Sequence, residues 1–111
     1  MAKLERVLQT PFEETVEIID HGLRKSSYSL TLEDSSEFLV ENARCKVLVY
    51  ERYSYLGGNR VSLTITLFQA NNGPVHLSAI TSGGSQAVFF KMNTIGEENF
   101  LYKLEEVIQG L

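Results

Sequence analysis

The feature that most constrains this chain is a pair of alternating runs, residues 61–67 and 75–81, separated by the sequence Asn71-Asn72-Gly73-Pro74. In both runs apolar side chains occupy every second position, with mostly small polar ones between them, which is typical of strands with one buried face. Asn, Gly and Pro are turn residues, so the two runs predict an antiparallel hairpin. The apolar positions are Val61, Leu63, Ile65 and Leu67, then Val75, Leu77 and Ala79.

Three other segments show strand patterns. Residues 45–52 alternate in a way that leaves both faces partly apolar, with Cys45, Val47 and Val49 on one face and Lys46, Leu48, Tyr50 and Arg52 on the other. Residues 26–32 alternate apolar and polar side chains, and residues 3–8 are compatible with a short strand. The acids and serines of residues 33–36 predict a turn, residues 56–59 a glycine hairpin turn, and residues 86–92 leave a further edge strand open.

Two amphipathic helices are predicted. Thr10, Pro11 and Glu13 provide a cap hydroxyl, a preset first residue and an N3 carboxylate, and Gly22 is expected to end this helix in a left-handed conformation. Residues 94–97 resemble a capping box that opens a second helix toward residue 111. The apolar stripes are Phe12, Val16, Ile19 and Leu23, then Phe100, Leu101, Leu104, Val107, Ile108 and Leu111.

These elements predict one α+β domain over residues 1–111, with the order β-α-β-β-β-β-α. An antiparallel sheet of four to six strands would carry both helices on one face, as in TATA-binding-protein-like or helix-grip folds; that analogy concerns topology alone. The other sheet face would be free for water, a ligand or a partner. We expect Ser62, Thr64, Thr66, Ser78, Lys46 and Arg52 on it.

Composition narrows the class of protein. The 111 residues include one cysteine and carry a net charge of −4. A single cysteine excludes an internal disulfide and multi-cysteine metal sites and favours a reducing compartment, so we expect a cytoplasmic protein without a bound metal or cofactor. Neither a signal peptide nor a membrane span is predicted. The acidic balance argues against nucleic acid as a partner, although acids gather on the helices and bases on the strands.

Two stretches carry a family resemblance: Gly57-Gly58-Asn59-Arg60-Val61-Ser62-Leu63, and residues 78–91 with the sequence SAITSGGSQAVFFK. They resemble the signature of an uncharacterised family of small bacterial proteins, a domain of unknown function, over nearly the whole chain. The resemblance implies a cytoplasmic bacterial protein. It supplies no activity, cofactor or catalytic residue.

The candidate ligand-binding residues come from the strand at 75–81 and from nearby turns and bases. Successive backbone N–H groups at Gly83 and Gly84 could bind an anion, although a glycine bulge that bends the sheet is the simpler interpretation. His76 shares a strand face with two serines and could meet hydroxyls across the hairpin. The full candidate set is His76, Ser78, Ser82, Gly83, Gly84, Ser85, Arg52 and Arg60.

The remaining chemistry-bearing residues have structural interpretations. We interpret His21 as a helix cap and Cys45 as a buried, unreactive residue at strand spacing. Neither forms a motif with a base or a nucleophile, so no catalytic residue is assigned.

Three functions remain open. The first is a non-enzymatic module that forms a homo-oligomer, such as a dimer, or binds a partner through the uncovered sheet face. The second is a helix-grip binder of a small apolar or anionic ligand, lined by some of Tyr50, Phe68, Phe89 and Phe90. The third is an enzyme that uses His76.

Overall fold

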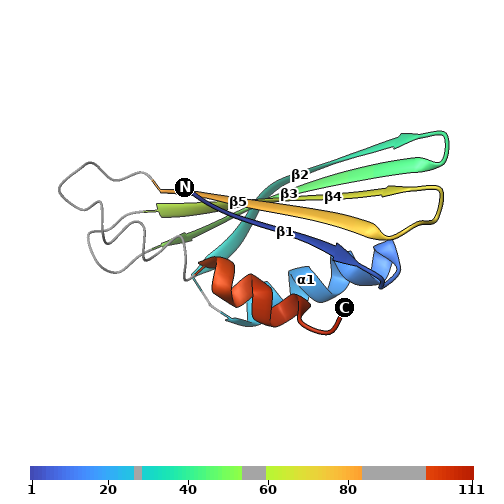
Figure 1. Ribbon diagram of the computed structural model, residues 1–111. Helices are drawn as coiled ribbons and strands as arrows, with labels where there is room; N and C mark the ends of the chain where they lie inside the picture. Colours follow the sequence, from blue (N-terminus) through green and yellow to red (C-terminus); the bar gives the residue numbers. More distant parts are fainter. Residues whose placement is uncertain (27–28, 54–59, 84–99) are drawn as a thin grey trace.

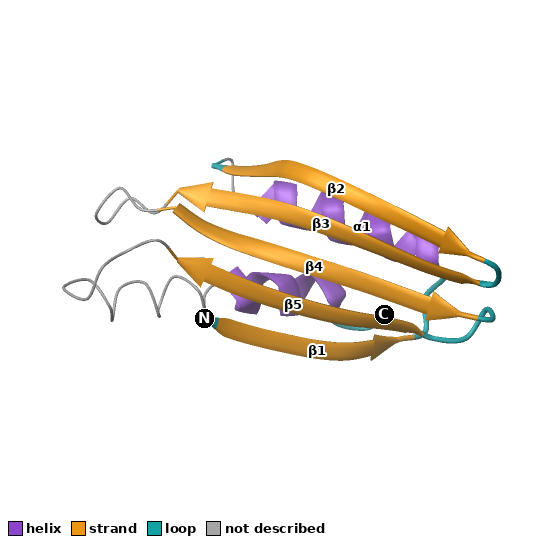
Figure 2. Ribbon diagram, turned by 90° about the horizontal axis from the view of Figure 1, so that it is seen from above, coloured by secondary structure: helices purple, strands orange, loops and turns teal. Residues whose placement is uncertain are grey.

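The structure is a computed structural model that describes residues 1–26, 29–53, 60–83 and 100–111 (Figure 1). Its elements are β1 (Ala2–Leu8), α1 (Phe12–Ser26), β2 (Leu30–Val40), β3 (Ala43–Tyr53), β4 (Arg60–Ala70), β5 (Val75–Gly83) and a helical stretch at residues 100–108. The strands form an antiparallel sheet in the order β1-β5-β4-β3-β2. Both helical segments lie on one face of the sheet (Figures 1 and 2), so the predicted two-layer α+β fold is confirmed.

The core lies between the sheet and the helices. In β4 and β5 the predicted alternation is confirmed, because Leu63, Ile65 and Ala79 are fully buried toward the helices. The register pairs apolar positions with each other, for example Ile65 with Ala79 and Leu67 with Leu77. Helical residues Ile19, Leu23, Phe100 and Leu104, also fully buried, cover this side. The apolar stripes of both helices therefore bury against one sheet face.

The helix α1 begins at Phe12, one residue from the predicted start, but it does not end at Gly22. The prediction that Gly22 stops the helix is wrong, and so is the interpretation of His21 as its cap, because α1 continues to Ser26. A Cβ at position 22 would lie 2.6 Å from Cγ1 of Val107. Gly22 is therefore where α1 and the C-terminal helical stretch approach each other closely, a packing role that local sequence cannot reveal.

The turn predicted at residues 33–36 is also wrong. Strand β2 runs through these residues and pairs with β3 as far as Val40, with a register shift between Leu32 and Asp34. As an edge strand, β2 exposes its side chains, so acids and serines that are typical of turns are equally compatible with it. The actual turn follows at Glu41, whose φ is 53°.

Strand β3 faces the helices with the opposite set of residues from the one expected. Leu48 pairs with Ile65 and Tyr50 with Leu63, and both are buried. Lys46 and Arg52 share their side, so the expectation that these bases lie on the uncovered face is wrong. Tyr50 also donates a 2.7 Å hydrogen bond to Oδ1 of Asp20 on α1. Burial and this hydrogen bond raise the pKa of Tyr50 well above its ordinary value.

The separation of charge between helices and strands follows from this register. Arg44 of β3 reaches Glu13 of α1 and Glu37 of β2, each at 2.8 Å, and lies over the ring of Phe12 at 4.1 Å. Arg6 of β1 pairs with Glu105. These sheet bases lie on the helix side, where acids of both helical segments meet them.

Three predictions fall outside the described residues: the glycine turn at 56–59, the edge strand at 86–92 and the capping box at 94–97. Among the helices within the described ranges, none has the length and apolar character needed to cross a bilayer.

Candidate functional site

The face of the sheet turned away from the helices is the surface on which the candidate residues meet. We call it the open face, since none of the described residues 1–26, 29–53, 60–83 and 100–111 forms an element packed against it (Figure 2). It comprises Lys3, Glu5 and Val7 of β1; Thr31, Asp34, Ser36, Phe38 and Val40 of β2; Ala43, Cys45, Val47, Val49, Glu51 and Tyr53 of β3; Arg60, Ser62, Thr64, Thr66, Phe68 and Ala70 of β4; and His76, Ser78, Ile80 and Ser82 of β5.

Three of the predicted residues, His76, Ser78 and Ser82, lie on this face along β5, as their spacing of two and four residues requires. Ser82 is opposite Ser62, and their hydroxyl oxygens are 2.6 Å apart. Gly83 is the last residue of β5. The next two candidate residues along the chain, Gly84 and Ser85, lie outside the described residues.

Neither of the two predicted arginines lies beside His76. Arg52 is on the helix side, with its guanidinium 4.8 Å from the ring centroid of Phe100, and burial lowers its pKa. Arg60, at the start of β4, is on the open face at the end away from His76, where it pairs with Glu51 at 2.9 Å and lies over the ring of Tyr53. The hydrogen bond with Tyr53 is the main cause that raises the pKa of Arg60. Both cations are therefore engaged away from His76.

A line of mostly apolar side chains crosses all five strands of the open face. The pairings run from Val7 to His76, from His76 to Phe68, from Phe68 to Cys45 and from Cys45 to Phe38. We call these five residues the apolar row. Val7, Phe68 and Phe38 are 54%, 42% and 60% exposed, whereas large apolar side chains on the helix side of β4 are fully or almost fully buried. The row is thus an apolar surface that the fold leaves in contact with solvent.

Two further rows lie beside the apolar row. One runs from Glu5 through Ser78, Thr66 and Val47 to Ser36, and the next from Lys3 through Ile80, Thr64 and Val49 to Asp34. Their central side chains are small or β-branched. The charges of these two rows are on the edge strands, with Lys3 and Glu5 on β1 and Asp34 on β2.

A shallow groove of about 450 Å³ lies at one side of the open face, between β1, β5 and β4. Its lining includes Glu5, Val7, Thr66, Phe68, His76 and Ser78. The apolar walls are Val7 and Phe68, with His76 between them. The groove has room for one aromatic side chain or a small ligand.

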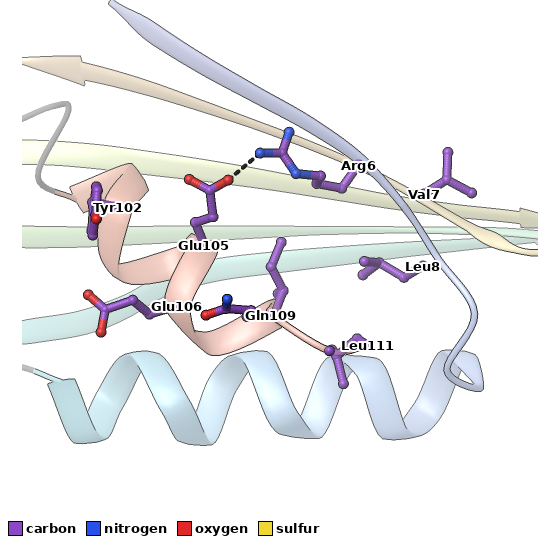
Figure 3. A pocket seen from close by; sticks show the side chains of 10 residues that line it. Arg6, Val7, Leu8, Tyr102, Glu105, Glu106, Gln109 and Leu111 are labelled. Carbon is purple, nitrogen blue, oxygen red and sulfur yellow. Dashed lines mark hydrogen bonds and ion pairs between the residues drawn. The ribbon is translucent and has the colours of Figure 1, made fainter.

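A second hollow, of about 510 Å³, lies on the helix side between β1 and the C-terminal helical stretch. Figure 3 shows Arg6 reaching toward Glu105, which forms an ion pair with it. Leu8, which also lines the hollow, is almost fully buried. Among the described residues that line this hollow, Arg6 is the one base, and its pairing with Glu105 leaves it poorly suited to attract an anion.

The described residues do not form a catalytic arrangement around His76. No hydrogen bond joins His76 to Ser78 or Glu5 within the described ranges, and nucleophilic catalysis requires such a base-to-nucleophile contact. Groups of three or more His, Cys, Asp or Glu side chains placed to hold a metal ion are also absent from those ranges.

Sequence reasoning missed the part of this face that lies on β2 and β3. Cys45, predicted to be buried and inert, is only partly buried, between Phe38 and Phe68 on the open face. Tyr50 and Phe68, two of the residues expected to contribute to a ligand pocket, lie on opposite sides of the sheet, so a pocket on one face would contain at most one of them. Phe89 and Phe90 lie outside the described residues. The faces of β3 follow from its pairing with β4, because residues opposite each other in neighbouring strands point to the same side and β4 alternates without ambiguity.

Comparison with known proteins places the chain in a family. No curated protein matches it. Among solved structures, the crystal structure of protein CV1439 from Chromobacterium violaceum, a structural genomics target, matches over 99% of this chain and 98% of that one, with 19% sequence identity and a TM-score of 0.44. A family model described as a family of unknown function matches residues 1–111. The chain therefore belongs to this family of unknown function, DUF6054.

Proposed function

We propose that this protein acts in the bacterial cytoplasm as a non-enzymatic module that binds another protein through its open face. The observation that carries the proposal is the apolar row, which crosses every strand and leaves Phe38 and Phe68 60% and 42% exposed. Contiguous exposed apolar surface of this kind is characteristic of interaction sites rather than of solvated sheet faces.

The composition of the rest of the face supports the same role. Thr64, Thr66 and Ser78 are small side chains that let another surface approach closely, and sheets pack face to face at about 10 Å. Their hydroxyls can donate to and accept from a partner, so burial does not leave them unsatisfied. An apolar row beside rows of small polar side chains combines the apolar and polar parts that a protein interface usually has.

The alternatives have less support. A helix-grip ligand would lie between the sheet and the helices. Leu63 and Ile65 of the sheet and Leu104 of the C-terminal helical stretch are fully buried in the core between these two layers. An enzyme based on His76 would need a partner for the imidazole, and Ser78 makes no such hydrogen bond within the described residues. Neither alternative accounts for the exposed apolar row that crosses the sheet.

Site-specific photo-crosslinking tests the proposal. A photo-reactive amino acid at Thr66, on the open face, is expected to yield a covalent adduct with a protein in living cells. The matched control has the same amino acid at Glu17, an exposed position on α1. Equal or lower yield at position 66 than at position 17 would overturn the proposal. The mass of the adduct identifies the kind of partner.

A further inference from the structure

We infer that the partner is a second copy of this chain, docked face to face about a two-fold axis parallel to β4, with Phe38 of each copy in the groove of the other. The inference rests on the proposed function and names its partner. The argument combines the register of the sheet, the charges on its edges and the shape of the groove.

The register fixes which residues such an axis brings together. Rotation about an axis along β4, the middle strand, places β1 of one copy over β2 of its partner and keeps each row over the same row. In the apolar row, Phe68 meets its own counterpart and Val7 meets Phe38. His76 meets Cys45 between them, so mostly apolar surface covers mostly apolar surface across the width of the sheet.

The same rotation pairs opposite charges. In the row that runs from Lys3 to Asp34, the lysine of each copy lies over the aspartate of the other. In the row between, Glu5 lies over Ser36, a hydroxyl that can donate to a carboxylate. Both edges of the interface are thus complementary in charge, and the two contacts are equivalent by symmetry.

An axis across the strands does not give this match. If it passed through the middle row, it would place the apolar row over the row of Lys3 and Asp34, with Val7 against Lys3 and Phe38 against Asp34. Apolar side chains would then cover charges and leave them without partners, which is costly. The axis along β4 is the one that the side chains favour.

The groove of one copy would bind Phe38 of the other. This side chain is 60% exposed at one edge of the face, and the groove at the opposite edge has apolar walls in Val7 and Phe68 and a volume of about 450 Å³. Rotation about β4 exchanges these two edges, so each Phe38 enters the groove of the other copy. The groove is complete only when the second copy contributes this ring.

The available area suits a reversible dimer. Five strands at about 4.8 Å and about seven residues at about 3.4 Å span roughly 20 by 24 Å, or on the order of 500 Å² for each copy before side-chain relief. A total near 1,000 Å² is at the lower limit of specific interfaces. We therefore expect a dimer that dissociates in the micromolar range, as weak complexes of this size do.

Charge reversal tests this geometry directly. Within one chain, Lys3 and Asp34 lie on opposite edges of the sheet, about 19 Å apart at four strand spacings, so they do not contact each other. Sedimentation at low salt over a range of concentrations is expected to show that Lys3→Glu and Asp34→Lys each weaken the dimer at least about tenfold, because both create like-charge pairs. An equimolar mixture of the two variants restores every pair and is expected to form a heterodimer near the wild-type affinity.

A second matched pair of variants tests the groove. Phe38→Ala is expected to weaken the dimer at least about tenfold, whereas Leu39→Ala is expected to leave it unchanged. Leu39 is the next residue and is 71% exposed, but it lies on the helix side of β2, opposite Arg44. Circular dichroism of each variant confirms that the fold is retained.

The outcomes separate this inference from the proposed function. A wild-type protein that stays monomeric up to about 1 mM, or a mixture that fails to restore the dimer, overturns the inference. If position 66 then still crosslinks to a protein of another mass, the proposed function stands with a different partner. If position 66 gives no adduct above the control, both fail.

Discussion

The two sides of β4 share one backbone but differ sharply in how much of their side chains is buried. Toward the helices, Val61, Leu63, Ile65 and Leu67 are at most 2% exposed, whereas on the open face Ser62, Thr64 and Thr66 are only partly buried and Phe68 is 42% exposed. One face therefore supplies the core, and substitutions on the other are expected to have little effect on folding. The difference separates residues that are needed for stability from residues that are available for binding.

The sharpest way to break this comparison is a pair of neighbouring substitutions. Ile65→Ala removes a fully buried side chain and is expected to lower the free energy of unfolding by about 2–5 kcal/mol. Thr66→Ala, one residue on, is expected to change it by only about 0.5 kcal/mol. Urea denaturation measures both. Similar losses at the two positions would mean that the open face contributes to the core.

The next largest loss of stability is expected from the hydrogen bond between Tyr50 of the sheet and Asp20 of α1. Tyr50→Phe removes the hydroxyl that donates to Asp20, at an expected cost of about 1–2 kcal/mol. The pKa of Tyr50 is raised in the folded protein, so the unfolded chain loses this proton first as the pH rises. Stability should therefore fall above about pH 10.

That alkaline fall should be smaller in Tyr50→Phe than in the wild type, because the variant lacks the group that titrates. Urea midpoints measured at several pH values between neutral and strongly alkaline compare the two proteins. Parallel curves for the wild type and the variant would show that the shifted pKa of Tyr50 is not the cause.

A smaller effect is expected within the helix layer. Gly22→Ala would gain helix propensity, but its Cβ meets Val107, whose nearest methyl carbon is 2.6 Å away. We expect a net loss of roughly 1 kcal/mol from this overpacking. In thermal unfolding, the double variant Gly22→Ala with Val107→Ala should be more stable than the two single losses predict. A Gly22→Ala protein more stable than the wild type would disprove the close approach.

The last prediction concerns the access of solvent to the open face, measured as the reaction rate of Cys45, and involves the smallest change in stability. In dilute folded protein this partly buried thiol is expected to react with a maleimide within about tenfold of its rate in denaturant. A cysteine at Ala79, fully buried on the helix side, placed in a Cys45→Ser chain, should react at least about a thousandfold more slowly. Equal rates would show that the two faces do not differ in access.

Much of the fold could be predicted because its strongest patterns are local. The alternation of β4 and β5 and the apolar stripe of α1 each encode a buried face within a few residues, and the order of elements follows from them. Gly22 could not be interpreted in this way, because its role depends on Val107, which is distant in the sequence. The sequence around a glycine does not show whether that glycine ends a helix or allows the helix to pack closely against another one.

The site was harder to predict because β3 is apolar on both faces. Leu48 and Tyr50 compete with Val47 and Val49 for the buried side, and only the pairing of Tyr50 with Leu63 decides between them. The error reversed the whole strand, since a strand alternates with a period of two. His76, Ser78 and Ser82 were placed correctly because β5 has no such ambiguity.

The exposed end of the β2–β3 hairpin has a consequence for handling the protein. Phe38, Leu39 and Val40 are all more than half exposed on an edge strand, a sequence type that stacks into aggregates when left unguarded. Glu37 and Glu41 flank the run and act as charged gatekeepers. A hydrogen bond from Arg44 is the main cause that lowers the pKa of Glu37, so this guard keeps its charge in mild acid. This charge beside the exposed run should help to keep the protein in solution as the pH falls into the mildly acidic range.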